Sequence, residues 1–288
     1  MKTQIRTLLA TTLVAASAVS VHAQATLLND TFADGDRTTQ NLPASAAHYF
    51  GTSTANGNIA VSSNALQFGY TGTGNTLSQV VSYFTPGGSP VALSVGDTLT
   101  ASFTLSGTAI ANAADTLRIG LYNSGGTRVS ADTSGIADAA FNSYTGYGLW
   151  ANMGTGSNST DLVQRTSSST TLFAGGAHSN VVSSTAPLGY STATTYTLTF
   201  EIEYTSESSV SLTFTDSNGY SKTAVDTSGL VTSFDTFALF LGSGSVETAF
   251  TVDDIHITTT SIPEPSSVAT LAGLGVLGLV ISRRRRAA

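Results

Sequence analysis

Apolar side chains recur at every second position through much of this chain, most clearly in the segment 195–205. Its apolar residues are Tyr196, Leu198, Phe200, Ile202 and Tyr204, which alternate with threonine and glutamate. A period of two places alternate side chains on opposite faces of a β-strand, whereas an amphipathic helix needs a period near 3.6. Segments 98–105 and 116–122 alternate in the same way, and helical periods are almost absent between residues 26 and 261. This part of the chain is therefore predicted to be all-β.

Further short segments have the composition of strands. They are 27–32, 48–52, 65–70, 78–84, 147–152, 162–165, 209–215, 237–241 and 250–257. Turn sequences rich in glycine, asparagine and proline separate them, as at 86–88, 123–126 and 218–219. A dozen or so short strands predict one antiparallel domain over residues 26–261, built as a two-sheet, jelly-roll-like sandwich. A β-helix and two smaller sandwiches are the alternatives.

Residues 1–25 have the pattern of a secretory signal peptide. Lys2 and Arg6 give a positive start, residues 8–21 are small and apolar, and Ala23 and Ala25 end two small-x-small sites. We therefore expect signal peptidase to cut after Ala23 or Ala25 and the body of the protein to be exported.

Residues 262–288 combine three features in a fixed order. These are the prolines and glutamate Pro263, Glu264 and Pro265, an uncharged run over 266–282, and the basic residues Arg283, Arg284, Arg285 and Arg286. Prolines interrupt a helix, and 17 residues in a helix span roughly 25 Å, close to the hydrocarbon thickness of a bilayer. Arginines stay on the cytoplasmic side. The tail is therefore predicted to hold one transmembrane helix, with the body outside.

This order of elements resembles the PEP-CTERM sorting signal of Gram-negative bacteria, over residues 262–286. The resemblance implies that an exosortase, a membrane protease-transpeptidase, removes the helix from a precursor anchored in the inner membrane. The mature body would then lie at the cell surface or in the extracellular space. Proteins with this signal accompany exopolysaccharide and biofilm production, so extracellular polysaccharide is a partner that the resemblance suggests.

The charge of the body excludes one class of partner. Five of the 11 basic residues and 17 of the 18 acidic residues lie in 26–261, a net charge of about −12. Such a body repels polyanions and has no basic stripe for phosphates, so nucleic acid is not an expected partner. The chain has no cysteine, which excludes disulfides and thiolate sites.

The first and last predicted strands resemble those of jelly-roll sandwiches such as concanavalin-A-like lectins, laminin-G-like domains and carbohydrate-binding modules. The segments in question are Leu28–Phe32 and Phe250–Ile257. The resemblance implies that these two strands pair and that acids near them hold a structural calcium, which prefers oxygen ligands. The candidate ligands are Asp30, Asp34, Asp36, Asp253 and Asp254. Alternatively, 34–36 is a solvated turn and 253–254 a strand bulge. No other cofactor is expected.

Glu201 and Glu203 are the pair of acids most similar to a catalytic pair. Alternate residues of a strand share one face about 6.5 to 7 Å apart, and glycosidases use paired carboxylates. No tryptophan lies beside them to line a sugar subsite, so we interpret them as the solvated face of a strand. His48, His178 and His256 are isolated in sequence, without the spacing of paired metal ligands, and are expected to be hydrogen-bonded within the protein or exposed. No catalytic residues are predicted.

Trp150 is the only tryptophan of the chain. With Tyr144 and Tyr147 it could form a stacking platform for a sugar ring, and packing in the core is the alternative. The sequence thus favours a non-enzymatic protein of the cell surface or extracellular matrix, either structural or associated with glycan. A glycan-active enzyme using Glu201 and Glu203, and an adhesin that binds proteins through strand edges, remain alternatives.

Overall fold

The computed structural model describes residues 23–53, 57–70, 76–110, 115–155, 159–243 and 249–261. One large sheet contains β1 (Ala23–Asp30), β3 (Gly57–Ser62), β4 (Ala65–Tyr70), β7 (Thr98–Gly107), β12 (Tyr196–Ser206), β13 (Ser209–Asp216), β14 (Ser221–Asp226) and β17 (Ala249–Ser261). The other contains β2 (His48–Thr52), β5 (Thr76–Tyr83), β8 (Thr116–Asn123), β9 (Thr145–Asn152), β10 (Thr160–Arg165), β11 (His178–Val182) and β16 (Thr236–Ser243). We refer to them as the first and second sheets.

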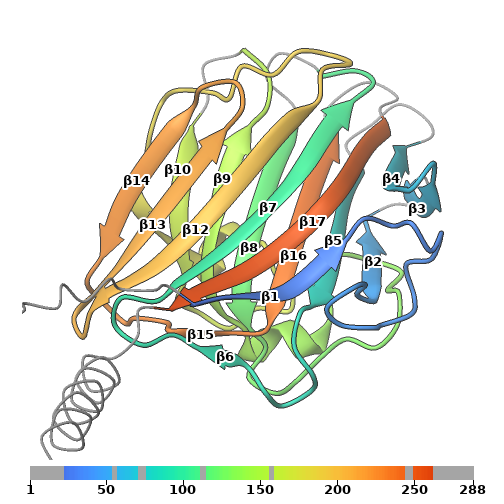
Figure 1. The fold of residues 1–288 in the computed structure, drawn as a ribbon. Helices are drawn as coiled ribbons and strands as arrows, with labels where there is room; N and C mark the ends of the chain where they lie inside the picture. Colours follow the sequence, from blue (N-terminus) through green and yellow to red (C-terminus); the bar gives the residue numbers. More distant parts are fainter. Residues whose placement is uncertain are drawn as a thin grey trace, which may run out of the picture. The chain divides into compact units, whose positions relative to one another are not determined.

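The two sheets pack face to face (Figure 1). The first has the order β14-β13-β12-β7-β17-β4-β3, with β1 also paired to β17, and the second has the order β11-β10-β9-β8-β16-β5-β2. Paired strands of the two sheets run antiparallel, and β6 (Val91–Ala92) pairs with β15 (Ser233–Phe234) beside the large sheets. The predicted all-β, two-sheet antiparallel sandwich is confirmed. The signal peptide before Ala23 and the tail after Ser261 lie outside the described residues.

The core lies between the sheets because alternate residues of each strand point inward. In β12, Leu198, Phe200 and Ile202 are fully buried, while the residues between them are partly exposed. Phe103 of β7 meets Phe237 of β16 across the interior, with ring centroids 5.7 Å apart in an edge-on arrangement. Burial of apolar surface at about 25 cal/mol per Å² makes this shared core the main stabilising contribution.

A further layer covers the outer face of the second sheet. Residues 124–144 and 166–177, which include the short 3-10 helices η1 (Ala139–Ser143) and η2 (Gly175–Ala177), pack on it. Its apolar contacts form a second cluster that includes Tyr122, Phe141, Phe173 and Phe240. The outward-facing side chains of β8 and β9 are therefore partly enclosed by protein.

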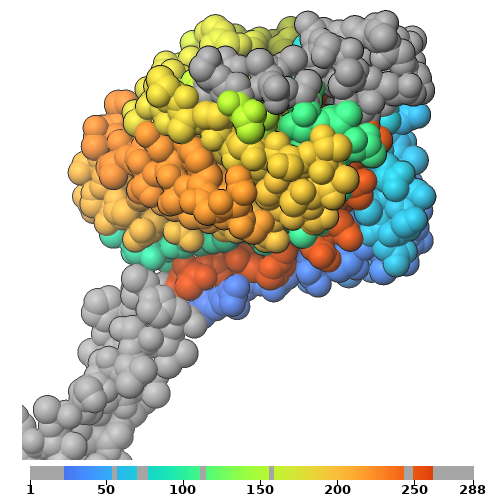
Figure 2. Space-filling model, turned by 90° about the horizontal axis from the view of Figure 1, so that it is seen from above, coloured from blue at the N-terminus to red at the C-terminus, as the bar shows by residue number. Residues whose placement is uncertain are grey.

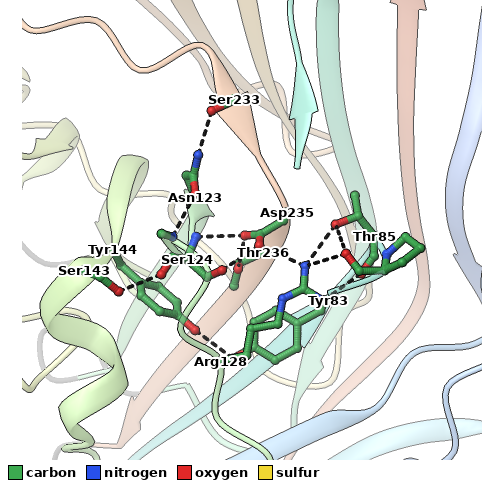
Figure 3. A network of polar contacts seen from close by, with 12 residues as sticks. Tyr83, Thr85, Asn123, Ser124, Arg128, Ser143, Tyr144, Ser233, Asp235 and Thr236 are labelled. Carbon is green, nitrogen blue, oxygen red and sulfur yellow. Dashed lines mark hydrogen bonds and ion pairs between the residues drawn. The ribbon is translucent and has the colours of Figure 1, made fainter. Parts of the chain in front are cut away.

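A polar network holds the loop after β8 in this layer (Figure 3). The buried carboxylate of Asp235 accepts hydrogen bonds from the Arg128 guanidinium at 2.9 Å and from the Ser124 hydroxyl at 2.6 Å. The hydroxyl of Tyr83 accepts from the Val129 N–H and lies 2.7 Å from the Tyr144 hydroxyl. Burial raises the pKa of Tyr83 to about 12, so the phenols stay neutral. The network ties the loop to β5 and to the residue before β16.

The strands give the body two distinct ends. β17 starts beside the end of β7, where Phe250 pairs with Gly107, and finishes at Ser261 beside the start of β7. β8 begins at the same end, because the Met153 N–H donates to the Asp115 carbonyl just before β8, and loop 183–195 bonds both Met153 and Gly107. Figure 2 views the body from this end, which the yellow loop 183–195 crosses, with the Leu188 N–H donating to the Asn152 carbonyl. No helix within the described ranges is long and apolar enough to cross a bilayer.

Candidate functional site

A small hollow opens on the second sheet at the end where β8 begins and β9 finishes. It is lined by Thr116, Arg118, Trp150, Ala151, Asn152, Ser159 and Asp161 and has a volume of about 110 Å³. Leu117, Ile119 and Leu149 point into the core between the sheets, so the alternating Arg118 and Trp150 point outward. The hollow therefore lies on the outer side of the sandwich.

Strand register brings its central residues together in one row. Trp150 of β9 lies directly opposite Arg118 of β8 and Asp161 of β10, and Arg118 in turn lies opposite Phe240 of β16. Directly opposed residues have their Cβ atoms about 4.5 to 5.5 Å apart, so their side chains interact. The row thus presents an aromatic ring, a guanidinium, a second aromatic ring and a carboxylate on four neighbouring strands.

The indole ring of Trp150 is held by protein groups. The guanidinium carbon of Arg118 lies 4.3 Å from its centroid, and the same guanidinium donates to the Phe173 carbonyl at 2.5 Å. The imidazole of His178 packs against Trp150 with centroids 4.8 Å apart and planes tilted by 55°. A cation over an aromatic face contributes roughly 0.5 to 2 kcal/mol. The ring is therefore fixed in place before any ligand arrives.

His178 is neutral in this setting. Burial, with Arg165 and Arg118 nearby, lowers its pKa to about 4. Its Nδ1 lies 3.0 Å from the Ala174 carbonyl, which can only accept, so Nδ1 carries the proton and Nε2 accepts from the Tyr122 hydroxyl at 3.3 Å. Sequence reasoning missed this residue as a part of the site, since nothing near His178 in the sequence marks it.

Two polar atoms of the hollow are unsatisfied. Four buried side-chain atoms lack a hydrogen-bond partner among the described residues, and two of them, Trp150 Nε1 and Asp161 Oδ1, belong to directly opposed residues lining this hollow. The indole N–H can only donate and the carboxylate oxygen can only accept. Leaving a buried polar group unpaired costs about 1 to 3 kcal/mol. A group that both accepts and donates, such as a water molecule or a hydroxyl, would satisfy both atoms.

The structure does not bring Tyr144 and Tyr147 to Trp150, so the predicted three-ring platform is not formed. Tyr147 points into the core, where its hydroxyl donates to Asp226 at 3.0 Å, and Tyr144 belongs to the network of Figure 3. Tyr147 and Trp150 are three positions apart on one strand and so lie on opposite faces. Trp150 does not pack in the core either, since it is half-buried and belongs to neither apolar cluster of the described residues.

The acids proposed as calcium ligands are mostly engaged with protein donors. Burial raises the pKa of Asp30, but hydrogen bonds from His48 at 2.9 Å and the Ala46 N–H at 3.0 Å outweigh it and lower the pKa. Asp36 accepts from the hydroxyl of Thr39 and both the N–H and hydroxyl of Thr38, and Asp34 accepts from the Asp36 N–H in a turn.

The last-strand acids lie at an irregularity of β17. The predicted pairing of the terminal strands β1 and β17 is present. The register of β17 shifts between Asp253 and His256, and Asp254 takes a left-handed backbone with φ of 52°. Among the described residues no group of three or more histidine or acidic side chains is arranged to hold a metal ion. The calcium site stays a prediction.

Asp30, His48 and Ser82 form a buried chain of hydrogen bonds. His48 Nε2 lies 2.9 Å from the Asp30 carboxylate, and His48 Nδ1 lies 2.6 Å from the Ser82 hydroxyl. These are the residue types of a nucleophilic triad. All three residues are at most 1% exposed, so a substrate cannot reach the hydroxyl in this conformation. The chain links β1 of the first sheet with β2 and β5 of the second.

Glu201 and Glu203 lie on the outer face of the first sheet, as the alternation predicted. Their cross-strand neighbours are threonines and serines of β7 and β13, and they have no hydrogen-bond or ion-pair partner among the described residues. Burial and the neighbouring charge of Glu203 raise the pKa of Glu201. The residues of the sorting tail, Pro263 to Pro265 and Arg283 to Arg286, lie outside the described residues.

Comparison with known proteins finds a sorting motif in the tail and several solved structures to which the chain is similar. Residues 261–286 match the PEP-CTERM protein-sorting motif. No curated protein matches the chain. Similar solved structures are lectin-like β-sandwiches. They include peanut lectin with a nonamer peptide (12% identity, 85% of this chain and 99% of that chain, TM-score 0.46). Others are the metal-free carbohydrate recognition domain of Emp46p (11%, 74% and 87%, TM-score 0.48) and the seed lectin of Lotus tetragonolobus (11%, 84% and 100%, TM-score 0.45).

Proposed function

We propose that this chain is an exported surface protein that associates with extracellular glycan through the hollow beside Trp150. The observation that carries the proposal is the pair of unpartnered buried atoms, Trp150 Nε1 and Asp161 Oδ1, on directly opposed residues. A sugar hydroxyl both accepts and donates, so neighbouring hydroxyls satisfy both atoms at once. Thr116, Asn152 and Ser159 extend the same uncharged hydrogen-bonding chemistry around the hollow.

Charge supports an uncharged ligand. Arg118 and Asp161 balance each other within the hollow, while residues 26–261 as a whole carry about −12. An anionic polymer approaching this body meets a repulsive field, whereas a neutral glycan does not. The site therefore favours neutral over acidic polysaccharide.

The tail supports an extracellular destination. The motif at 261–286 is a protein-sorting motif, and we propose that signal peptidase and an exosortase process the two ends of an inner-membrane precursor. Ser261 lies at the end of β17, whereas the hollow lies at the end of the body where β17 begins. A ligand in the hollow is thus remote from the point where the tail leaves the body. We further propose a role in exopolysaccharide or biofilm, structural or adhesive to glycan, for the mature body.

We propose no catalytic activity. The nucleophile-like Ser82 is buried, and Glu201 and Glu203 lie among hydroxyl side chains on the open face of a sheet. A glycan hydrolase is the second candidate, because the pKa of Glu201 is raised by burial and by Glu203, as a general acid requires.

The binding proposal is tested by co-sedimentation of the exported protein with the insoluble extracellular polysaccharide of its own cells. Asp161→Asn should lose most retention, because the amide cannot accept as a charged oxygen does and offers an N–H of its own. Glu207→Gln is the matched control, since it removes the same charge from an exposed turn. Equal retention of both variants would contradict the proposal.

The sorting proposal has its own test. Mass spectrometry of surface or secreted protein should find a start at Gln24 or Thr26 and an end near Pro263. Recovery of extracellular protein that still carries Arg283 to Arg286 would overturn it.

A further inference from the structure

We infer that one end of the body docks on the membrane-bound exosortase while the tail is cut near Pro263. It is the end where β17 finishes, and we call it the tether end. Its segments are the loop 94–97 before β7 and the turn 206–209 between β12 and β13. The inference rests on the proposed sorting function and adds the surface of the body that takes part in it.

Strand register brings the segments of the tether end together. Thr98, the first residue of β7, pairs with Thr260 near the end of β17 and with Glu203 near the end of β12. The Gly96 N–H donates to the Tyr204 carbonyl at 2.7 Å, which ties the loop to β12. β1 pairs with β17 and begins at the same end (Figure 1). Both expected membrane segments of the precursor are therefore joined to the tether end.

Very little chain separates the sheet from the expected cut. Thr260 is still paired with β7, and only Ser261 and Ile262 precede Pro263. An extended chain spans at most about 3.6 Å per residue, so the expected membrane helix starts no more than roughly 18 Å beyond Ser261, at Ser266.

That length leaves little room for the enzyme. The headgroup layer on one side of a bilayer takes about 5 to 7 Å of it. The remaining distance of roughly 12 Å is about the width of a single helix with its side chains. An enzyme that reaches Pro263 in this space lies directly against the tether end.

The tether end offers an apolar contact to such a partner. Val95 is 50% exposed, and it lies between the small residues Ser94 and Gly96. Among the described residues, the other exposed large apolar side chain is Val225 of β14. The exposed acid Glu207 lies in the turn of the tether end, and anionic lipid headgroups repel it. The surface therefore fits an apolar patch of a protein better than the surface of a bilayer.

The alternative is that the enzyme pulls the end of β17 out of the sheet. Thr258 and Thr259 are buried, and β17 is paired with β7 as far as Thr260. Freeing these residues would expose them and would leave backbone groups of both strands without partners. Docking of the intact tether end needs no such opening.

The test follows the conversion of the full-length precursor to processed protein in its own cells, by pulse-labelling and gel separation. Val95→Glu should slow conversion roughly fivefold or more, because it places a charge in an apolar contact. Val225→Glu is the matched control, since it makes the same change at an exposed valine three strands away from β7, on the outer face of the sheet. It should convert at the wild-type rate. Both sites are exposed, so both variants should keep the wild-type Tm.

Two further variants separate docking from unpairing of β17. A flexible spacer of about six residues after Ser261 should restore the conversion of Val95→Glu, because the enzyme then reaches Pro263 away from the body. The chain has no cysteine, so Thr98→Cys combined with Thr260→Cys gives a single disulfide between directly opposed residues. Thiol labelling confirms that this bond has formed. The locked protein should still be converted.

Three results would overturn the inference. Conversion of Val95→Glu at the wild-type rate would show that the tether end makes no contact. Precursor that accumulates when the disulfide is closed would show that β17 leaves the sheet. Faster conversion of Val95→Arg, beside slow conversion of Val95→Glu, would assign the contact to anionic lipid.

The sorting proposal survives each of these results, because the wild-type tail is still removed. It fails on a different observation, which is extracellular wild-type protein that keeps Arg283 to Arg286.

Discussion

The guanidinium carbon of Arg118 lies 4.3 Å from the ring centroid of Trp150, its direct neighbour across β8 and β9. Because Arg118 covers one side of the indole, the only tryptophan of the chain is not an open stacking surface and instead forms part of the lining of the hollow. The indole N–H of Trp150 is buried, as is Oδ1 of Asp161 on the neighbouring strand, and neither atom has a hydrogen-bond partner among the described residues. The predictions below follow from this arrangement and from the buried groups around it.

Trp150→Ala should lower the free energy of unfolding by about 2 kcal/mol. A fully buried aromatic ring costs about 3 to 5 kcal/mol to remove, and this ring is half-buried, though braced by Arg118 and His178. Trp150→Phe keeps an aromatic surface and should lose under about 1 kcal/mol. Urea unfolding of both variants measures the difference. An alanine variant as stable as wild type would show that the ring is not packed as described.

His178 should make the protein lose stability in mild acid. Its pKa is about 4 in the folded protein and about 6.5 when unfolded. The unfolded chain therefore binds a proton first as pH falls, and stability is lost between about pH 6.5 and pH 4, by up to about 3 kcal/mol. His178→Gln removes this contribution, so its urea midpoint should change less than that of wild type between pH 7 and pH 4.5. The same pH dependence in both proteins would contradict the assignment.

Ser82→Ala should lower the stability of the fold, because Ser82 has a structural role and not that of a catalytic nucleophile. The Ser82 hydroxyl is the partner of His48 Nδ1, and an unpaired buried nitrogen costs about 1 to 3 kcal/mol. Thermal unfolding measures this loss. A fluorophosphonate probe, which labels reactive serines, should leave Ser82 unmodified in the native protein. Labelling that disappears in Ser82→Ala would show that the hydroxyl is reached and reactive.

Glu201→Gln should be neutral to slightly stabilising at pH 7. The pKa of Glu201 is raised by burial and by Glu203, so its ionised form costs free energy in the folded state. Glutamine carries no charge and removes that cost. Glu203→Gln should also stay within about 0.5 kcal/mol of wild type. Neither variant should alter the release of reducing sugar from any polysaccharide, since none is expected from wild type. Sugar release by wild type that stops in Glu201→Gln would establish the hydrolase instead.

Most strands were predictable from local pattern, and the exceptions are three of the four outer strands and two strands of two residues each. Every segment predicted as a strand overlaps one in the structure, and 48–52 and 65–70 have the observed bounds of β2 and β4. β3, β11 and β14 were missed, as were the two-residue strands β6 and β15. The first three are outer strands of their sheets, where only one side is paired and polar residues are common. Their alternation is correspondingly weak.

The site was only partly predictable from the sequence, because the register between strands determines which side chains lie next to one another. Trp150 was singled out, and its three-residue spacing from Tyr147 already implied opposite faces. Arg118 and Asp161 lie beside Trp150 only because β8, β9 and β10 pair in this register. His178 is the first residue of β11, which follows the irregular segment 166–177. Periodicity assigns a face to a residue, but it does not say which residue of another strand lies opposite. That choice comes from packing of the whole body.

The indole N–H of Trp150 offers the most direct measurement of the central claim. A chain with one tryptophan gives one indole cross-peak in a proton–nitrogen correlation spectrum, so the peak needs no assignment. On addition of the cells' own extracellular glycan, solubilised as short chains, the account predicts a downfield shift of that proton as Nε1 gains an acceptor. It also predicts that Asp161→Asn will abolish the shift, whereas Glu207→Gln will retain it. A peak that stays in place at saturating glycan, while glycan is bound, would contradict the claim that the hollow beside Trp150 is the binding site.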